Sequence, residues 1–223
     1  CESGFSFPDP TDNDIVWGGC YEGGLERFDL RSHQSHSVDP WPDRALDAPA
    51  DSAKYRWNWT QPLAMSPWDH NTLYVGSQYV HRTTDGGETW TVISPDLTTN
   101  DTSKMHSSGG LTDDNLGVEY CCTLFAIAES PVEKGLIWAG SNDGKVHVTR
   151  DAGAHWADVS PNVAGFPRGG TISNIEPSRW DAGRAYISVD GHQENNRDPF
   201  IYETTDYGKS WRLISGGIPK SVF

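Results

Sequence analysis

An eight-residue segment that occurs three times constrains the fold of this chain more than any other feature. Its copies are residues 83–90, 149–156 and 204–211, and all three read Thr-x-Asp-x-Gly-x-x-Trp. An Asp at the head of a tight turn can accept hydrogen bonds from backbone N–H groups two residues on. A Gly two places later adopts positive φ without a clash from a Cβ atom. The pattern therefore predicts a turn that leads into a strand whose first residue is a buried Trp, with its indole N–H available to a carbonyl.

We expect the Asp, the Gly two places after it and the Trp of each copy to be structural. These nine residues are Asp85, Gly87, Trp90, Asp151, Gly153, Trp156, Asp206, Gly208 and Trp211. Replacing one of the aspartates should lower stability and leave ligand affinity unchanged.

The turn belongs to a longer repeat of four short strands. Each unit has a strand that ends near a Pro, an aromatic-centred second strand, a third strand that runs into the turn and a fourth that begins at the Trp. The Asp residues of successive copies are 66 and 55 residues apart, whereas a WD40 propeller blade needs only about 40–45. This spacing predicts an all-β propeller with at least four antiparallel four-stranded blades and enlarged loops. We place the blades at about residues 1–40, 55–97, 118–163 and 171–219, the first with a degenerate turn at Asp29.

The repeated motif resembles the Asp-box, or BNR repeat, of sialidases, two-propeller xyloglucanases and sortilin-type propellers. Segments 55–59, 94–98 and 117–120 are most similar to large bacterial BNR-repeat proteins described as glycosyl hydrolases or as sortilin-like. The resemblance implies a secreted or periplasmic propeller that acts on or binds glycans or peptides. It is specific for the fold and says little about function.

Charge and hydropathy exclude several classes of partner. The formal net charge of −14 and the pI near 4.8 argue against nucleic acid, because phosphate binding requires a basic surface. No apolar run approaches the length of a membrane span, so we expect no membrane insertion. We predict no cofactor and no metal, since Cys-x-x-Cys and His pairs at zinc spacing are missing from the sequence. The final residues read as the start of another strand, so we expect the chain to be part of a larger propeller.

The four cysteines divide into two pairs. Cys1 and Cys20 flank the first predicted hairpin and could form a bridge across an antiparallel strand pair. Cys121 and Cys122 are adjacent in an apolar run, where strand alternation sends neighbouring side chains to opposite faces. We interpret them as small buried hydrophobic residues rather than as a redox pair.

Three long loops mark the expected functional face: residues 39–54, 98–117 and 190–199. In a propeller, the connections between blades share a face with the turns between second and third strands, opposite the Asp-box turns. Long loops in a compact domain are usually functional. The candidate catalytic acids on this face are Asp113, Asp114, Glu119, Asp190 and Glu194.

Aromatic residues near the same face suggest a ligand site. We expect Glu119 and Arg56 to head the inner strands of their blades and to reach the mouth of the central channel. The candidate ligand-binding residues are Arg56, Trp57, Trp59, Glu119 and His192. Aromatic rings beside an Arg suit sugar stacking, but the same Trp residues are also expected to pack between blades, and both readings stay open.

Two functions fit these features. A binding scaffold would hold a glycan or peptide on the loop face, whereas a glycoside hydrolase would need two carboxylates about 5–9.5 Å apart across the scissile bond. We favour binding, because the chain carries no catalytic signature beyond the repeated turns. A sialidase is disfavoured, since its Phe-Arg-Ile-Pro-type start is missing.

Overall fold

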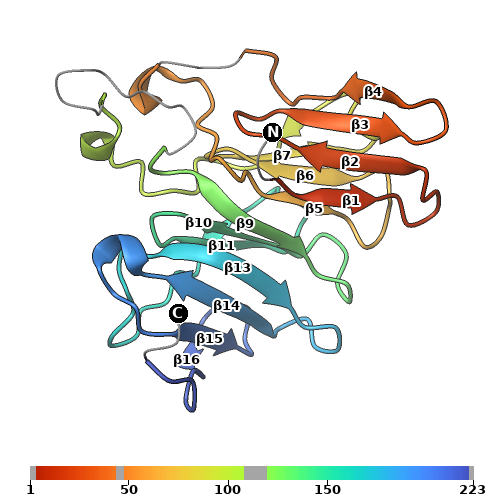
Figure 1. Ribbon diagram of the computed structural model, residues 1–223. Helices are drawn as coiled ribbons and strands as arrows, with labels where there is room; N and C mark the ends of the chain where they lie inside the picture. The colour runs from red at the N-terminus through yellow and green to blue at the C-terminus, as the bar shows by residue number, and fades with distance from the viewer. Residues whose placement is uncertain (1–3, 44–47, 108–119, 221–223) are drawn as a thin grey trace.

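The computed structural model describes residues 4–43, 48–107 and 120–220. Within them the chain forms four antiparallel four-stranded sheets, in which strands that follow one another in sequence are hydrogen-bonded neighbours. The helical elements of this part are three short 3-10 turns: η1 (Ala50–Ser52), η2 (Thr102–Lys104) and η3 (His192–Glu194). The chain is therefore an all-β propeller with at least four blades, as the repeat predicts (Figure 1).

The strands follow the chain from the inner to the outer edge of each blade. Blade one contains β1 (Ser6–Pro8), β2 (Ile15–Gly19), β3 (Leu25–Asp29) and β4 (Gln34–Ser37). Blade two contains β5 (Leu63–Met65), β6 (Leu73–Gly76), β7 (Val80–Thr83) and β8 (Thr91–Val92). Blade three contains β9 (Leu124–Glu129), β10 (Ile137–Ser141), β11 (Val146–Thr149) and β12 (Ala157–Asp158). Blade four contains β13 (Thr171–Pro177), β14 (Ala185–Asp190), β15 (Phe200–Thr204) and β16 (Arg212–Leu213).

Several strands differ from their predicted bounds. The inner strands of blades two and three begin at Leu63 and Leu124, whereas the sequence pattern suggested starts near residues 55 and 118. The outer strands β8, β12 and β16 begin one residue after the Trp and are two residues long. Short outer strands leave few unpaired backbone groups at the edge of each blade, which discourages pairing with other chains.

The hydrophobic core lies between neighbouring blades rather than inside any one of them. One cluster joins Trp17 and Leu25 of blade one to Leu73 of blade two. A second cluster joins blades two and three, and a third joins blades three and four. Successive blades thus bury the faces that they turn toward each other, as quasi-repetitive folds do.

The repeated turn, which we call the box turn (residues 83–90, 149–156 and 204–211), has the same pattern of hydrogen bonds in each copy, except that the His155 ring replaces a Thr or Ser hydroxyl in the second. In the first, the Asp85 carboxylate accepts bonds from the Thr83 hydroxyl (2.6 Å) and from the N–H and hydroxyl of Thr89 (2.9 and 2.6 Å). The Thr83 hydroxyl accepts from the N–H of Gly87 (3.0 Å). The Asp therefore bonds to a backbone N–H four residues on, not two as predicted, because the turn is wider than a simple Asx-turn.

These hydrogen bonds lower the pKa of the box aspartates. Bonds from the side chain of Thr83 and from Thr89 lower the pKa of Asp85 to about 2. In the second copy, bonds from the side chain and N–H of His155 lower the pKa of Asp151 to about 2. Hydrogen bonds to an ionised carboxylate favour the charged form, so the turns are most stable with both aspartates ionised.

The Gly and Trp of each box turn contact the preceding blade. The indole N–H groups of Trp90, Trp156 and Trp211 donate to the carbonyls of Val38, Ile93 and Val159, at 2.9, 2.8 and 2.7 Å. The box Gly packs against the same residue: a Cβ on Gly87 would lie 2.7 Å from the Cβ of Val38. The box turn is therefore a joint between blades as well as a connection between strands.

Cys20 is disulfide-bonded, and Cys1, its expected partner, lies outside the described residues. None of the helical turns in the described part of the chain is long or apolar enough to cross a bilayer.

Candidate functional site

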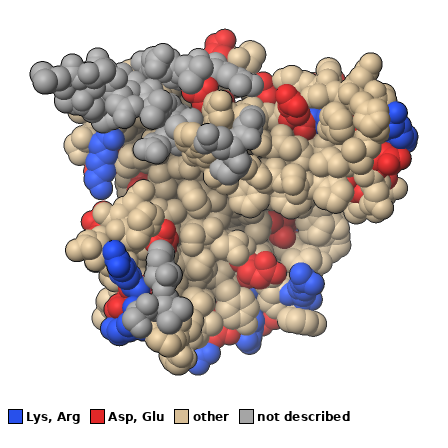
Figure 2. Space-filling model, in the orientation of Figure 1, with Lys and Arg blue, Asp and Glu red and all other residues tan. Residues whose placement is uncertain are grey.

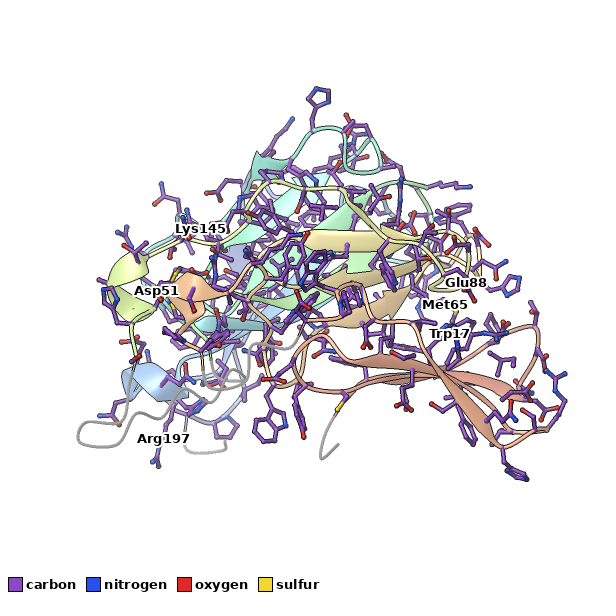
Figure 3. The ribbon with its side chains drawn as sticks, turned by 90° about the horizontal axis from the view of Figure 1, so that it is seen from above. Trp17, Asp51, Met65, Glu88, Lys145 and Arg197 are labelled. Atoms are coloured by element: carbon purple, nitrogen blue, oxygen red, sulfur yellow. The ribbon has the colours of Figure 1, made fainter. Side chains whose placement is uncertain are left out.

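Two opposite faces of the propeller differ in their loops. The turns η1, η2 and η3 all lie on one side of the molecule, at the left of Figure 1. Seen from above, Glu88 of a box turn lies at one end of the molecule, and Asp51, Lys145 and Arg197 lie toward the other (Figure 3). We call the latter the loop face.

Two adjoining cavities open on the loop face, and together we call them the loop-face cleft. The outer cavity has a volume of about 1090 Å³ and the inner one about 530 Å³. Both are lined by Lys104, Asp143, Gly169 and Glu194. The cleft is built from the segment before β5, the loop between blades two and three with the start of β9, the β10–β11 turn, the loop between blades three and four, and the β14–β15 loop.

Acidic residues line the cleft, and most of them are held by the protein itself. Asp143 accepts bonds from the N–H and hydroxyl of Thr99 (2.8 and 2.6 Å) and from the hydroxyl of Ser141. Asp101 accepts from the N–H of Ser103 (3.1 Å), which caps η2. These carboxylates fix the loops that shape the cleft.

Asp158 is also held by the protein, through an ion pair with Lys145 and a hydrogen bond from Ser160. Its carboxylate lies 2.8 Å from the Lys145 ammonium and accepts from the N–H of Ser160 at 3.0 Å. Burial alone would raise the pKa of Asp158, but the bonds from Lys145 and Ser160 outweigh burial and lower the pKa to about 2.

Glu194 differs from the other cleft acids. Of the four acids that line the two cavities in the described part of the chain, only Glu194 has a carboxylate without a hydrogen bond or ion pair to another described residue. It lies in η3, at the point where the two cavities meet. Its carboxylate is available to a ligand.

Aromatic rings border the same space. Trp59 and Phe125 line the inner cavity, and Phe166 lines the outer one. The Trp59 ring packs against Tyr21, with centroids 5.5 Å apart, and Phe166 packs against Tyr202 at 5.4 Å. Rings held in place by a second ring, next to a few polar groups, are typical of sites that orient a small ligand.

Arg56 and Trp57 lie in the interior, not at the mouth of the channel where Arg56 was expected. Arg56 is 6% exposed, and its guanidinium donates to the carbonyl of Cys122 (3.0 Å) and to Asp96 (2.8 Å). Trp57 is 2% exposed, and its ring packs so closely on Gly23 that a Cβ there would lie 2.5 Å away. Both side chains join blades, because their polar and apolar surfaces are already occupied by other parts of the protein.

The remaining predicted residues fall in three places. Asp190 ends β14, and its carboxylate bonds to the N–H (2.9 Å) and the ring (2.6 Å) of His192 in the exposed η3 turn. Trp59 and Glu194 line the cleft. Asp113, Asp114 and Glu119 lie outside the described residues, and the strand that Glu119 was expected to head begins at Leu124.

The β10–β11 turn and the two inter-blade loops bring five residues to the cleft that were not among the predicted site residues. These are Lys104, Asp143, Lys145, Phe166 and Arg168. Asp143 and Lys145 could have been found by the topological rule used for the β14–β15 loop, because both turns connect second and third strands.

A third cavity, of about 610 Å³, lies along the inner strands. Its lining comes from all four blades and is mostly apolar, with Phe7, Ala64, Ile127 and Ile175 among its residues. On the face drawn in Figure 2, most charged residues lie toward the edges, and a few acidic residues lie near the middle among other residues. Its apolar lining makes the channel wall a poorer site for a polar ligand than the loop-face cleft.

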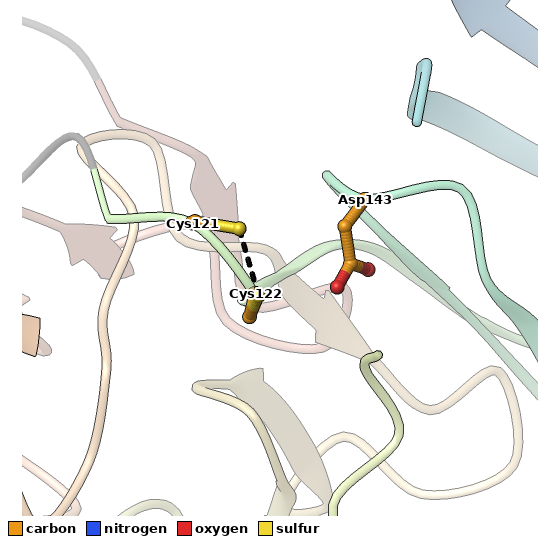
Figure 4. Close-up of side chains that lie close together, drawn as sticks. All are labelled: Cys121, Cys122 and Asp143. Atoms are coloured by element: carbon orange, nitrogen blue, oxygen red, sulfur yellow. Dashed lines mark hydrogen bonds between the residues drawn. The ribbon is translucent and has the colours of Figure 1, made fainter. Parts of the chain in front are cut away.

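One group of side chains has the composition of a metal site. The sulfur atoms of Cys121 and Cys122 and a carboxylate oxygen of Asp143 lie within 4.8 Å of one another (Figure 4). The sequence did not predict this group, because Cys122 and Asp143 belong to different loops.

Comparison with known proteins identifies the fold. Neither a scan against models of protein families nor a search of curated proteins finds a match. Among solved structures, the chain is similar to a GH74 xyloglucanase from Xanthomonas campestris (20% identity, TM-score 0.61), covering 97% of this chain and 30% of that one. It is also similar to a GH74 enzyme from Niastella koreensis (18% identity, TM-score 0.58), covering 96% of this chain and 29% of that one.

A protein described as an auxiliary nutrient binding protein, from Bacteroides thetaiotaomicron, shares the fold as well. It has 10% identity and a TM-score of 0.54, with 94% of this chain and 40% of that one covered. The chain thus spans about 30% of the length of the xyloglucanase. At these identities, the likeness shows a propeller fold.

Proposed function

We propose that the chain belongs to the Asp-box propellers and binds a glycan in its loop-face cleft, outside the cytoplasm. The main support for the proposal is the cleft itself. Its lining includes Glu194, whose carboxylate has no hydrogen bond or ion pair to another described residue, and the rings of Trp59, Phe125 and Phe166. A sugar presents apolar ring faces and hydroxyl groups, which match aromatic side chains and a charged acceptor. The xyloglucanase of similar fold supports a carbohydrate ligand over a peptide.

A binding assay with matched variants tests this proposal. Calorimetric titration with xyloglucan oligosaccharides should give saturable binding, and Trp59→Ala should weaken it by about two- to twelve-fold, the equivalent of one aromatic contact at ~0.5–1.5 kcal/mol. Trp180→Ala is the control, because Trp180 is 89% exposed and lies in the β13–β14 loop, on the same face as the box turns.

Glu194→Gln should weaken binding by about ten-fold, since a charged acceptor forms stronger hydrogen bonds than a neutral one. Glu88→Gln, in a box turn with its side chain 65% exposed, is the matched control. Equal affinities for Glu194→Gln and Glu88→Gln, or the absence of glycan binding across neutral and acidic oligosaccharides, would refute the proposal. Binding of a peptide instead would favour a sortilin-like scaffold.

The alternative is a glycoside hydrolase, and four carboxylates in one cleft are the observation that favours it. Three of them are held by hydrogen bonds to the protein, which leaves Glu194 without a free carboxylate partner among the described residues. Release of reducing sugar from a polysaccharide, lost in Glu194→Gln, would establish hydrolysis; binding without turnover would leave the scaffold function.

A further inference from the structure

Cys121 and Cys122 are adjacent in the chain, yet their side chains meet. Their sulfur atoms are 2.7 Å apart (Figure 4), whereas neighbouring residues of an extended strand point to opposite faces. The expectation that these two side chains face apart was therefore wrong. The reason is the backbone of Cys122, whose φ of +64° is left-handed.

A left-handed backbone is disfavoured for any residue with a side chain and persists only when its surroundings enforce it. Here the surroundings act on three backbone groups. The Asn142 side chain donates to the carbonyl of Tyr120 (2.7 Å) and accepts from the N–H of Thr123 (3.0 Å). Arg56 donates to the carbonyl of Cys122 (3.0 Å). Hydrogen bonds therefore fix the backbone before, at and after Cys122.

A metal ion fits this geometry poorly. Two thiolates on one tetrahedral Zn²⁺, each about 2.3 Å from the metal, are ~3.8 Å apart, so the sulfur atoms would have to separate. The third group, the Asp143 carboxylate, already accepts bonds from Thr99 and Ser141. A disulfide, with sulfur atoms ~2.05 Å apart, requires only that they move slightly closer.

We propose that Cys121 and Cys122 close to a vicinal disulfide, which makes the inner wall of the loop-face cleft redox-sensitive. The proposal does not depend on the proposed glycan binding. Cys121 lines the inner cavity and is partly exposed, whereas Cys122 is buried. Closure joins residues that already touch, in a cavity that Asn58 and Trp59 also line, and fixes the segment that leads into β9.

Closure requires an external disulfide, such as oxidised glutathione, as the oxidant. The thiolate of Cys121 attacks this disulfide, forming a mixed disulfide and releasing one thiol. The thiolate of Cys122 then attacks the Cys121 sulfur and displaces the second thiol. The net change is two protein thiols oxidised and one external disulfide reduced to two thiols. Within the reduced pair, the contact between the two sulfur atoms raises the pKa of Cys121 and lowers the pKa of Cys122, so the first step requires the Cys121 proton to pass to Cys122 or to solvent.

Peptide mass measurement tests the proposal without interference from Cys20. Cleavage after Lys and Arg gives the peptide of residues 105–134, which contains Cys121 and Cys122 and no other cysteine. After equilibration with oxidised glutathione, denaturation and treatment with N-ethylmaleimide, this peptide should be two hydrogens lighter than the dithiol and carry no label. Reduction before labelling should give two labels.

The variant Cys122→Ser traps the intermediate. It retains the accessible Cys121 and lacks the second sulfur, so it should keep one glutathione on Cys121 where the wild-type peptide keeps none. Two labels on the wild-type peptide after oxidation, or a stable glutathione adduct on it, would overturn the proposal. Protection of both thiols by added Zn²⁺ together with failure to oxidise would overturn it in favour of a metal site. The wild-type measurement stands even where the variant does not fold.

Discussion

Replacing Gly87 by Ala provides the sharpest test of the box turn as a joint between blades. The first box turn contains two neighbouring glycines with positive φ, Gly86 at +74° and Gly87 at +102°. They differ in their surroundings. A Cβ on Gly86 would have no neighbour nearer than 3.8 Å, whereas a Cβ on Gly87 would lie 2.7 Å from the Cβ of Val38. The pair separates backbone strain from contact with the preceding blade.

The expected cost follows from these distances. An alanine in the left-handed region costs about 1–2 kcal/mol, and Gly86→Ala should lose no more than this. The other turns support that limit, because Ala152 and Tyr207 occupy the equivalent position with φ of +56° and +60°. Gly87→Ala adds a close contact with Val38, and overpacking of this kind costs about 1–3 kcal/mol. The total for Gly87→Ala is therefore about 2–5 kcal/mol.

Urea titrations of the two variants, followed by Trp fluorescence, measure this difference. Gly87→Ala should unfold at clearly lower urea than Gly86→Ala, with similar slopes. Val38→Ala removes two methyl groups that lie 3.0 and 3.2 Å from the added Cβ. In the Gly87→Ala background it should therefore cost less than in the wild type. If Gly86→Ala and Gly87→Ala are equally unstable, the glycine is needed only for its backbone conformation, and its contact with Val38 does not contribute to stability.

Two further predictions concern the same turns. Trp211→Phe keeps most of the ring packing but removes the indole N–H that donates to the Val159 carbonyl at 2.7 Å. The free energy of unfolding, measured in urea, should therefore fall by about 1 kcal/mol. The control Trp180→Phe, at a residue that is 89% exposed, should leave stability unchanged, and equal losses for the two variants would contradict the role of the indole N–H. Because the pKa of Asp85 and of Asp151 is about 2 in the fold, below the ordinary value of 3.8, their ionised forms stabilise the protein above pH 4, and this contribution is lost as the pH falls from about 4 toward 2. Asp85→Asn should flatten the decline of the urea midpoint over that range, and an unchanged pH profile would show that the carboxylate does not act in this way.

The box turns could be predicted from the sequence because their internal bonds are local. Within residues 83–89, each of these hydrogen bonds joins residues that are at most four positions apart. A fixed spacing of Asp, Gly and Trp in the sequence therefore indicates them. Gly87 and Trp90 of the same turn also contact Val38, which lies 49 and 52 positions before them. No spacing rule within one repeat encodes these contacts, which is why the turn read as an isolated motif rather than as a joint.

The expected position of Arg56 was wrong for a related reason, whereas packing of Trp57 between blades is one of the two readings that the sequence leaves open. An aromatic-rich segment before a predicted blade has the composition of an inner strand, and strand residues near a channel mouth are reasonable ligand contacts. What decides the position of Arg56 is a pair of acceptors, on Asp96 and Cys122, which are 40 and 66 residues away. Burial of a charged side chain requires such partners, and only the folded chain identifies them.

The cleft acids, in contrast, could have been sorted further from the sequence. Asp101 and Asp158 each precede a Ser by two positions, and each accepts bonds from both the N–H and the hydroxyl of that Ser. Asp96 does the same with Thr98. In this chain, Asp-x-Ser/Thr therefore indicates an acid that a local turn already uses. The two residues that follow Glu194 are both Asn, so Glu194 has no Ser or Thr two positions later. Its side chain is also longer than that of Asp and reaches past its own backbone. The sequence thus contains a local reason to separate Glu194 from the structural aspartates, and a search for ligand contacts on the loop face should begin with it.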